Sequence, residues 1–166
     1  MRKEALIFFV CLFGNIAPAW AAPINNLDVG SSAYGVMWGT KSNTYYGESQ
    51  VTETLAIGVQ STVWKNSHTV NEFFGQFDID DQTKTIIGTR YFDSKTRAYL
   101  GVALATPVNF EWTTYLSAMI GKGFHELTAG ASYQLSDNTD IDFSYRHYRY
   151  HHNKDSIMIG LTYKTW

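Results

Sequence analysis

Apolar and polar residues alternate along most of this chain, in short segments separated by turn-forming residues. From residue 53 onward the segments recur about every 14 residues, and none keeps the helical period of 3.6. A period of two places successive side chains on opposite faces of a β-strand. The chain is therefore predicted to be all-β. The clearest segments are residues 55–63, 69–79, 84–93, 100–105, 114–121, 127–135, 140–146 and 157–164.

The residue types on the two faces decide the environment of these strands. One face carries Leu, Ile and Val in mid-strand with aromatic residues towards the ends, and the other carries mostly Gly, Ala, Ser, Thr and Gln. Small side chains fit the interior of a narrow barrel, and the apolar face fits lipid with aromatic girdles. Closure also removes unpaired strand edges, which hydrocarbon cannot satisfy. We expect a closed antiparallel transmembrane β-barrel, with a soluble β-protein as the alternative.

The number of strands depends on how the first part of the chain is interpreted. Residues 53–164 hold eight alternating segments, and bacterial barrels have an even number of strands. Residues 28–39 also alternate, and their pairing with residues 45–51 would make ten strands. Eight is the prediction, and ten is the alternative.

The N-terminal residues have the pattern of a secretory signal peptide. Arg2 and Lys3 precede an apolar stretch at residues 5–17, and Ala19 and Ala21 fit the small-residue rule for cleavage. We predict a signal peptide at residues 1–21 and a barrel domain at residues 22–166, exported by the Sec route, with a buried N-terminal helix as the alternative. Cys11, the only cysteine, would leave with the signal, so no disulfide is expected.

Composition narrows the possible partners. Charged residues make up 17% of the chain, compared with ~25% in average soluble domains, and the net charge is −2. The chain therefore has no basic field for a polyanion, and no nucleic-acid partner is expected.

Several charged residues share the small-residue face and would point into the lumen. Opposite charges in a narrow lumen are expected to pair, because unpaired buried charge is costly. The prediction is a salt-bridged plug, with a selectivity element in a small pore as the alternative. The residues of this predicted network are Arg90, Asp140, Asp142, Arg146 and Lys164.

The stretch 146–154 is rich in basic and aromatic residues. A periplasmic C-terminus would place it at the top of a strand and in the last outward-facing turn, where Arg and Tyr suit lipopolysaccharide phosphates and headgroups. The alternative is a solvated rim without a ligand. No metal or cofactor is expected, since adjacent strand residues such as His151 and His152 point to opposite faces. The predicted lipid-contact residues are Arg149, Tyr150, His151, His152 and Lys154.

No catalytic residues are predicted. A nucleophile and a base must face each other, and Ser144 and His147, three residues apart on one strand, face opposite ways. His125 and Glu126 follow a Gly-Lys-Gly turn but match no known hydrolase motif. A lipid A-modifying enzyme is therefore only an alternative.

The last hairpin resembles that of small outer-membrane barrels, the OmpA transmembrane domain and the OmpX/Ail family. The resemblance rests on residues 129–135, the Asp/Asn turn after them, residues 140–146 and the closing residues 160–166. It implies a barrel in the Gram-negative outer membrane, with periplasmic chaperones and a barrel-assembly machinery that reads Tyr163 and Trp166. The chain departs from the family pattern in having a terminal Trp instead of Phe, with Tyr163 out of phase by one residue.

The resemblance also implies a non-enzymatic role, either membrane-structural or in surface interaction of the adhesion, virulence or stress type. The expected partners are outer-membrane lipid, lipopolysaccharide and a host surface factor. A narrow pore for small solutes is the first alternative.

Overall fold

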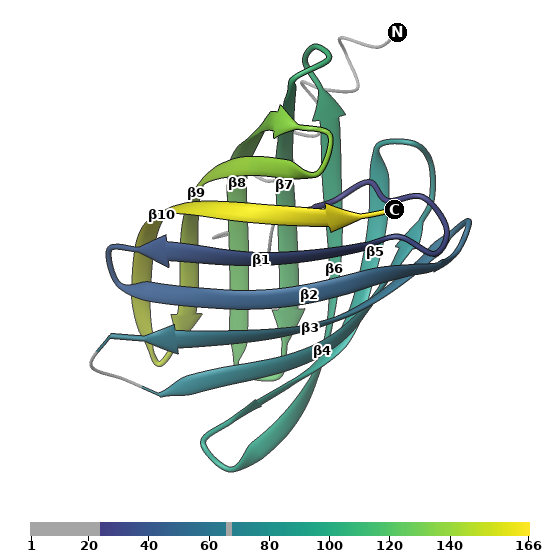
Figure 1. The fold of residues 1–166 in the computed structure, drawn as a ribbon. Coiled ribbons are helices and arrows are strands. Elements are labelled where there is room, and N and C mark those ends of the chain that lie inside the picture. Colours follow the sequence, from purple (N-terminus) through teal and green to yellow (C-terminus); the bar gives the residue numbers. More distant parts are fainter. Residues whose placement is uncertain (1–23, 66–67) are drawn as a thin grey trace, which may run out of the picture.

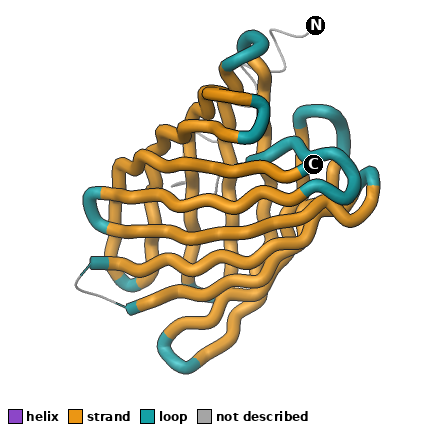
Figure 2. The backbone as a smooth tube through the Cα atoms, viewed as in Figure 1, coloured by secondary structure: helices purple, strands orange, loops and turns teal. Residues whose placement is uncertain are grey.

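The computed structural model describes residues 24–65 and 68–166, and the predicted signal peptide lies outside the described residues. These residues form strands joined by short turns (Figure 2). No helix in this part of the chain is long and apolar enough to cross a membrane. The strands are β1 (Ser32–Gly39), β2 (Ser42–Thr52), β3 (Leu55–Trp64), β4 (Thr69–Asp78), β5 (Thr83–Phe92), β6 (Lys95–Pro107), β7 (Trp112–Gly121), β8 (Phe124–Ser136), β9 (Thr139–Tyr150) and β10 (His152–Thr165).

The ten strands form one closed antiparallel barrel (Figure 1). Each strand pairs with the next along the chain, and β1 closes the ring against β10, with Tyr34 opposite Tyr163. The prediction of eight strands is therefore wrong. The eight-strand prediction leaves β1 and β2 outside the barrel. In the structure, β1 is hydrogen-bonded to β10 on one side and to β2 on the other. The first and last strands therefore pair with each other, and the sheet has no unpaired edge strand.

The strand register determines how steeply the strands lean. Following directly paired residues round the barrel from Ser32 on β1 leads to Asn153 on β10. In the register between β1 and β10, Asn153 corresponds to a position 12 residues beyond Ser32, so the shear of the barrel is 12. For ten strands this shear corresponds to a tilt of roughly 40°. The front strands β1–β4 consequently cross the rear strands β6–β8 in Figure 1. A strand at this tilt rises about 2.5 Å per residue, so ten residues span the ~25 Å apolar band of a membrane barrel.

The outer face of the barrel is apolar on every side. Burial alternates along each strand, and the side chains that point outward include exposed Leu, Ile, Val, Phe and Tyr. On the ten strands, the charged residues at outward positions are Arg149 and Asp155 alone. The predicted assignment of the apolar face to the outside is confirmed by this burial pattern. The inner face is not limited to small side chains, because it also carries Trp64, Phe74, Tyr99, Tyr115 and Phe124.

The two ends of the barrel carry opposite charge. We call the end with the chain termini the termini end and the other the distal end. Among described residues, the charged groups near the distal end are Lys41, Lys65, Asp93, Lys95, Arg97, Lys122, Arg149, Lys154 and Asp155. Those near the termini end are Asp28, Glu53, Asp78, Asp80, Asp81, Lys84, Glu111, Asp137, Asp140 and Lys164. The distal end is therefore basic and the termini end acidic.

Candidate functional site

Two buried arginines and two buried glutamates occupy the middle of the lumen. Arg90 pairs with Glu72 (Nη2 to Oε2, 2.9 Å) and with Glu126 (Nη1 to Oε2, 2.6 Å). Glu126 also lies 3.6 Å from Arg146 Nε, so it bridges the two cations. Both arginine side chains are 0% exposed. We call Glu72, Arg90, Glu126 and Arg146 the central network.

Neighbouring groups complete the surroundings of these two cations. The Arg90 guanidinium lies 4.4 Å from the ring centre of Phe124 and 5.4 Å from that of Tyr148. Arg146 Nη1 donates to Thr44 Oγ1 at 2.8 Å. A buried cation needs both countercharge and hydrogen-bond acceptors, because water no longer solvates it. The inner face supplies both to the two arginines.

A second polar group fills the lumen towards the termini end. Asp142 accepts hydrogen bonds from Ser132 and from Thr162 Oγ1, the latter at 2.5 Å. Lys164 Nζ pairs with Asp140 Oδ2 at 2.6 Å. These polar side chains bond to one another, while Asp140 Oδ1 has no hydrogen-bond partner in the described chain.

The chain segment before β1 also enters the lumen. Ile24 and Asn25 are both buried, and Asn25 Nδ2 donates to Glu48 Oε1 at 2.7 Å. Gln76 Nε2 donates to the other oxygen of the same carboxylate at 2.9 Å. The described chain therefore starts inside the barrel and leaves it at the termini end, where Gly30 turns with a φ of 87°.

Aromatic and basic side chains close the distal mouth of the barrel. We call Trp64, His68, Phe92, Arg97, Tyr150 and Lys154 the mouth cluster. The Arg97 guanidinium lies 4.6 Å from the Phe92 ring centre and 4.8 Å from that of Tyr150. It also donates to the Tyr150 hydroxyl (3.0 Å) and to the Lys122 carbonyl (2.7 Å).

His68 is the titratable ring in the mouth cluster, and it stacks on Phe92 with ring centres 5.8 Å apart. Burial lowers the pKa of His68 from its ordinary value, and the nearby charge of Lys154 lowers it further, against an opposing effect of Asp93. These surroundings therefore favour the neutral form of His68 at the mouth.

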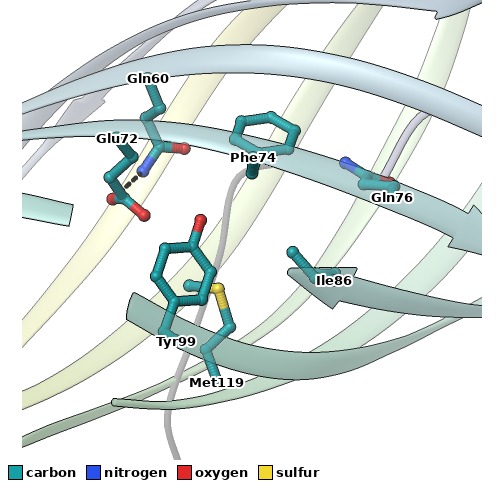
Figure 3. Close-up of a pocket in the computed structure, with 7 residues that line it drawn as sticks. All are labelled: Gln60, Glu72, Phe74, Gln76, Ile86, Tyr99 and Met119. Carbon is teal, nitrogen blue, oxygen red and sulfur yellow. Dashed lines mark hydrogen bonds between the residues drawn. The ribbon is translucent and has the colours of Figure 1, made fainter. Parts of the chain in front are cut away.

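The space that remains in the described barrel is small. A cavity of about 10 Å³ lies beside Gln60, Glu72 and Tyr99, and Figure 3 shows Gln60 hydrogen-bonded to Glu72 at its wall. This volume holds about one water molecule. A recess of about 350 Å³ opens at the termini end, where the ion pair of Lys84 and Asp78 (2.8 Å) lies. The two spaces share no lining residue.

The structure places the five predicted lumen residues on the inner face, with one ion pair inside the predicted set and the other partners outside it. Arg90 and Arg146 pair with Glu126, whereas Asp140 pairs with Lys164 and Asp142 with hydroxyls. The sequence analysis did not identify the lumen carboxylates Glu48, Glu72 and Glu126. Glu126 shares the phase of the small residues of its segment, a signal that could have identified it. Glu48 lies in β2, which the eight-strand count excludes.

The five predicted lipid-contact residues are divided between two surfaces. Arg149 is exposed at an outward position of β9. Tyr150 and Lys154 belong to the mouth cluster, with Lys154 Nζ 5.4 Å from the Trp64 ring centre. His151 forms the tip of the last turn with a φ of 56°, and His152 is exposed beside it. These residues therefore do not form one common lipid-facing rim.

The remaining candidate residues also have clear positions. Tyr163 and Trp166 are exposed at the termini end of β10. Within the described chain, no cluster of three or more His, Cys, Asp or Glu residues has the geometry to hold a metal ion.

Comparison with known proteins identifies the fold only. No family model and no curated protein matches the chain. A solved structure of the porin KdgM in complex with disordered oligogalacturonate aligns with a TM-score of 0.52 at 8% identity, over 80% of this chain and 98% of the other. The porin NanC aligns with a TM-score of 0.50 at 11% identity, over 81% and 99%. The specific resemblance to the OmpA and OmpX/Ail proteins stays a prediction. The chain thus has the closed-barrel fold found in outer-membrane porins.

Proposed function

We propose that the mature chain, residues 22–166, is an outer-membrane β-barrel of a Gram-negative bacterium with a lumen closed by its own side chains. The uncharged outer face carries this proposal: outward positions of ten strands hold only two charged residues, both near one end. Such a surface suits hydrocarbon, and every strand edge is paired as hydrocarbon requires. Since even-stranded bacterial barrels keep both chain ends in the periplasm, the basic distal end faces the outside.

The filled lumen supports a structural or surface-interaction role over a channel. The central network, the buried Asn25 and the mouth cluster lie in series along the barrel. Ions crossing it would have to separate buried ion pairs, which is costly when one partner loses its countercharge. Surface partners of the adhesion, virulence or stress type would meet the distal turns, and lipopolysaccharide would meet the wall below them.

The proposal includes a non-enzymatic role. His125 and His147 occupy outward positions, whereas Ser144 is buried on the inner face. A serine nucleophile and a histidine base on opposite faces of the same wall cannot act together. Tyr163 and Trp166, exposed at the end of β10, are the proposed signal to the barrel-assembly machinery, reached through periplasmic chaperones.

A narrow pore is the second candidate, and one observation favours it. Ten strands enclose a wider lumen than eight, and the inner face is lined by polar groups from Glu48 to Arg146. In a pore, the central network would be a movable constriction.

Two measurements test these assignments. A folded membrane barrel should float with phosphatidylcholine vesicles and shift its gel mobility after boiling in detergent. A chain that is monodisperse in buffer without detergent would refute the membrane assignment. In planar bilayers we expect no discrete conductance steps, and reproducible steps from the pure protein would favour the pore.

A further inference from the structure

The charged and histidine side chains at outward positions of the barrel wall are gathered at one place near the distal end. His125 on β8, His147 and Arg149 on β9, and Asn153 and Asp155 on β10 all occupy outward positions. Arg149 lies directly opposite both His125 and Asn153, and His147 lies opposite Asp155. Directly paired residues have Cβ atoms about 5 Å apart, so these side chains form one patch. We call these five residues the outer-wall cluster.

The acidic residue of this cluster is already engaged. Asp155 Oδ1 lies 2.5 Å from His147 Nδ1, and it accepts a hydrogen bond from the Tyr145 hydroxyl at 2.8 Å. Arg149, by contrast, is exposed, and no carboxylate of the described chain lies within ion-pair distance of it. The patch therefore presents a guanidinium without a protein counterion.

Below Arg149, the outward-facing residue pairs of β9 and β10 change from polar to apolar. His147 and Asp155 form the next outward row, Tyr145 and Ile157 the row after it, and Phe143 and Ile159 the row after that. At the rise of about 2.5 Å per residue, Arg149 stands roughly 15 Å above Phe143. This order matches the passage from headgroups through the aromatic belt to acyl chains. Arg149 thus lies at the depth of lipid phosphates.

We propose that the outer-wall cluster binds the phosphate of a lipid headgroup in the leaflet at the distal end, with Arg149 as its principal contact. An arginine fork matches two phosphate oxygens, and Asp155 is turned to His147 and Tyr145, which leaves the Arg149 guanidinium without a carboxylate partner among the described residues. Outward positions of β1–β7 carry no charged residue, so the site is confined to the β8–β10 wall. The proposal rests on the membrane location proposed above. It keeps Arg149 from the predicted lipopolysaccharide contact and places the site on the wall beside the last turn.

The test uses the whole mature chain in detergent micelles, titrated with lipid A and observed by native mass spectrometry. We expect lipid A to bind in preference to its dephosphorylated form, and Arg149→Ala to lose roughly tenfold in affinity, with a smaller loss for Arg149→Lys. Lys95→Ala is the matched control, because it removes one exposed cation from the same end of the barrel, on β6. An unchanged boiling-dependent gel shift confirms that each variant is folded.

Each other outcome contradicts the proposal in a distinct way. Equal binding of dephosphorylated lipid A, or an unaffected Arg149→Ala variant, would show that no phosphate site exists there. Complete displacement of lipid A by inorganic phosphate would assign the site to free anions, and a loss of dimers in Arg149→Ala would assign it to a second copy of the chain. Flotation with phosphatidylcholine vesicles separates the two proposals, since it fails for every variant only when the membrane location itself is wrong.

Discussion

Replacing Glu126 with glutamine tests the central network most directly. The substitution keeps the size of the side chain but removes the charge that bridges Arg90 (2.6 Å) and Arg146 (3.6 Å), whose side chains are both 0% exposed. Arg90 keeps Glu72, whereas Arg146 keeps only the threonine hydroxyls of its surroundings as acceptors. Removing one partner of a buried ion pair costs about 3–5 kcal/mol. Because one of the two cations retains a counterion, we expect about 3 kcal/mol.

The assay is urea unfolding in lipid vesicles, followed by tryptophan fluorescence and by the boiling-dependent gel shift. Glu53→Gln, the same chemical change in an exposed turn, should alter the free energy of unfolding by less than about 0.5 kcal/mol. Adding Arg146→Met to Glu126→Gln removes the stranded cation, so the double variant should be more stable than the sum of the single losses by roughly 1–2 kcal/mol. The inference that these ion pairs hold the lumen closed would be refuted by two results together. Glu126→Gln would lower the free energy of unfolding by less than about 1 kcal/mol, and the effects of Glu126→Gln and Arg146→Met would simply add in the double variant.

Two further substitutions test the packing of the wall and the state of the mouth. A Cβ at Gly101 would stand 2.6 Å from the Ala118 carbonyl oxygen, so Gly101→Ala should cost about 1–3 kcal/mol in urea unfolding, whereas Gly75→Ala, with no atom nearer than 3.5 Å, should cost less. Equal costs would contradict this close approach of the strands. Because the folded-state pKa of His68 is below its ordinary 6.5, stability should be complete above that value and fall as pH drops towards the lower folded pKa. Urea midpoints at about pH 8 and about pH 5 should therefore differ more for the wild type than for His68→Gln, and parallel shifts would count against a buried neutral ring.

A closed lumen gives the opposite charges at the two ends a physical meaning. In the proposed membrane orientation, the basic distal turns and the acidic termini-end turns would lie in separate compartments. In that orientation, residues on the turns would meet solvent, while the outward-facing Arg149 would meet lipid headgroups. Binding to a soluble surface partner and binding to lipid are therefore separable by substitution.

The sequence by itself determined the β-class, the two faces of the wall and the position of most charged side chains. Period-two alternation is a local property, and it places Arg90, Arg146, Asp140 and Asp142 inside without any knowledge of strand partners. The same alternation predicts that most of the outer wall carries no charged side chain. Neither result needs the tertiary structure, because side-chain direction along a strand follows from the backbone alone.

Only the tertiary structure decided the number of strands and the ion-pair partners. It also decided which residues of the stretch 146–154 join the mouth cluster. β1 enters the ring because it meets β10 across more than a hundred residues of sequence, a pairing that local alternation cannot reveal. Glu126 rather than Asp142 neutralises Arg146, because strand tilt and register set which inward side chains reach the same level of the lumen. The assembled barrel also brings Tyr150 of β9 into contact with Arg97 of β6 at the mouth, whereas the outward direction of Arg149 follows from strand alternation. Closure and register are non-local, so they follow from the assembled barrel.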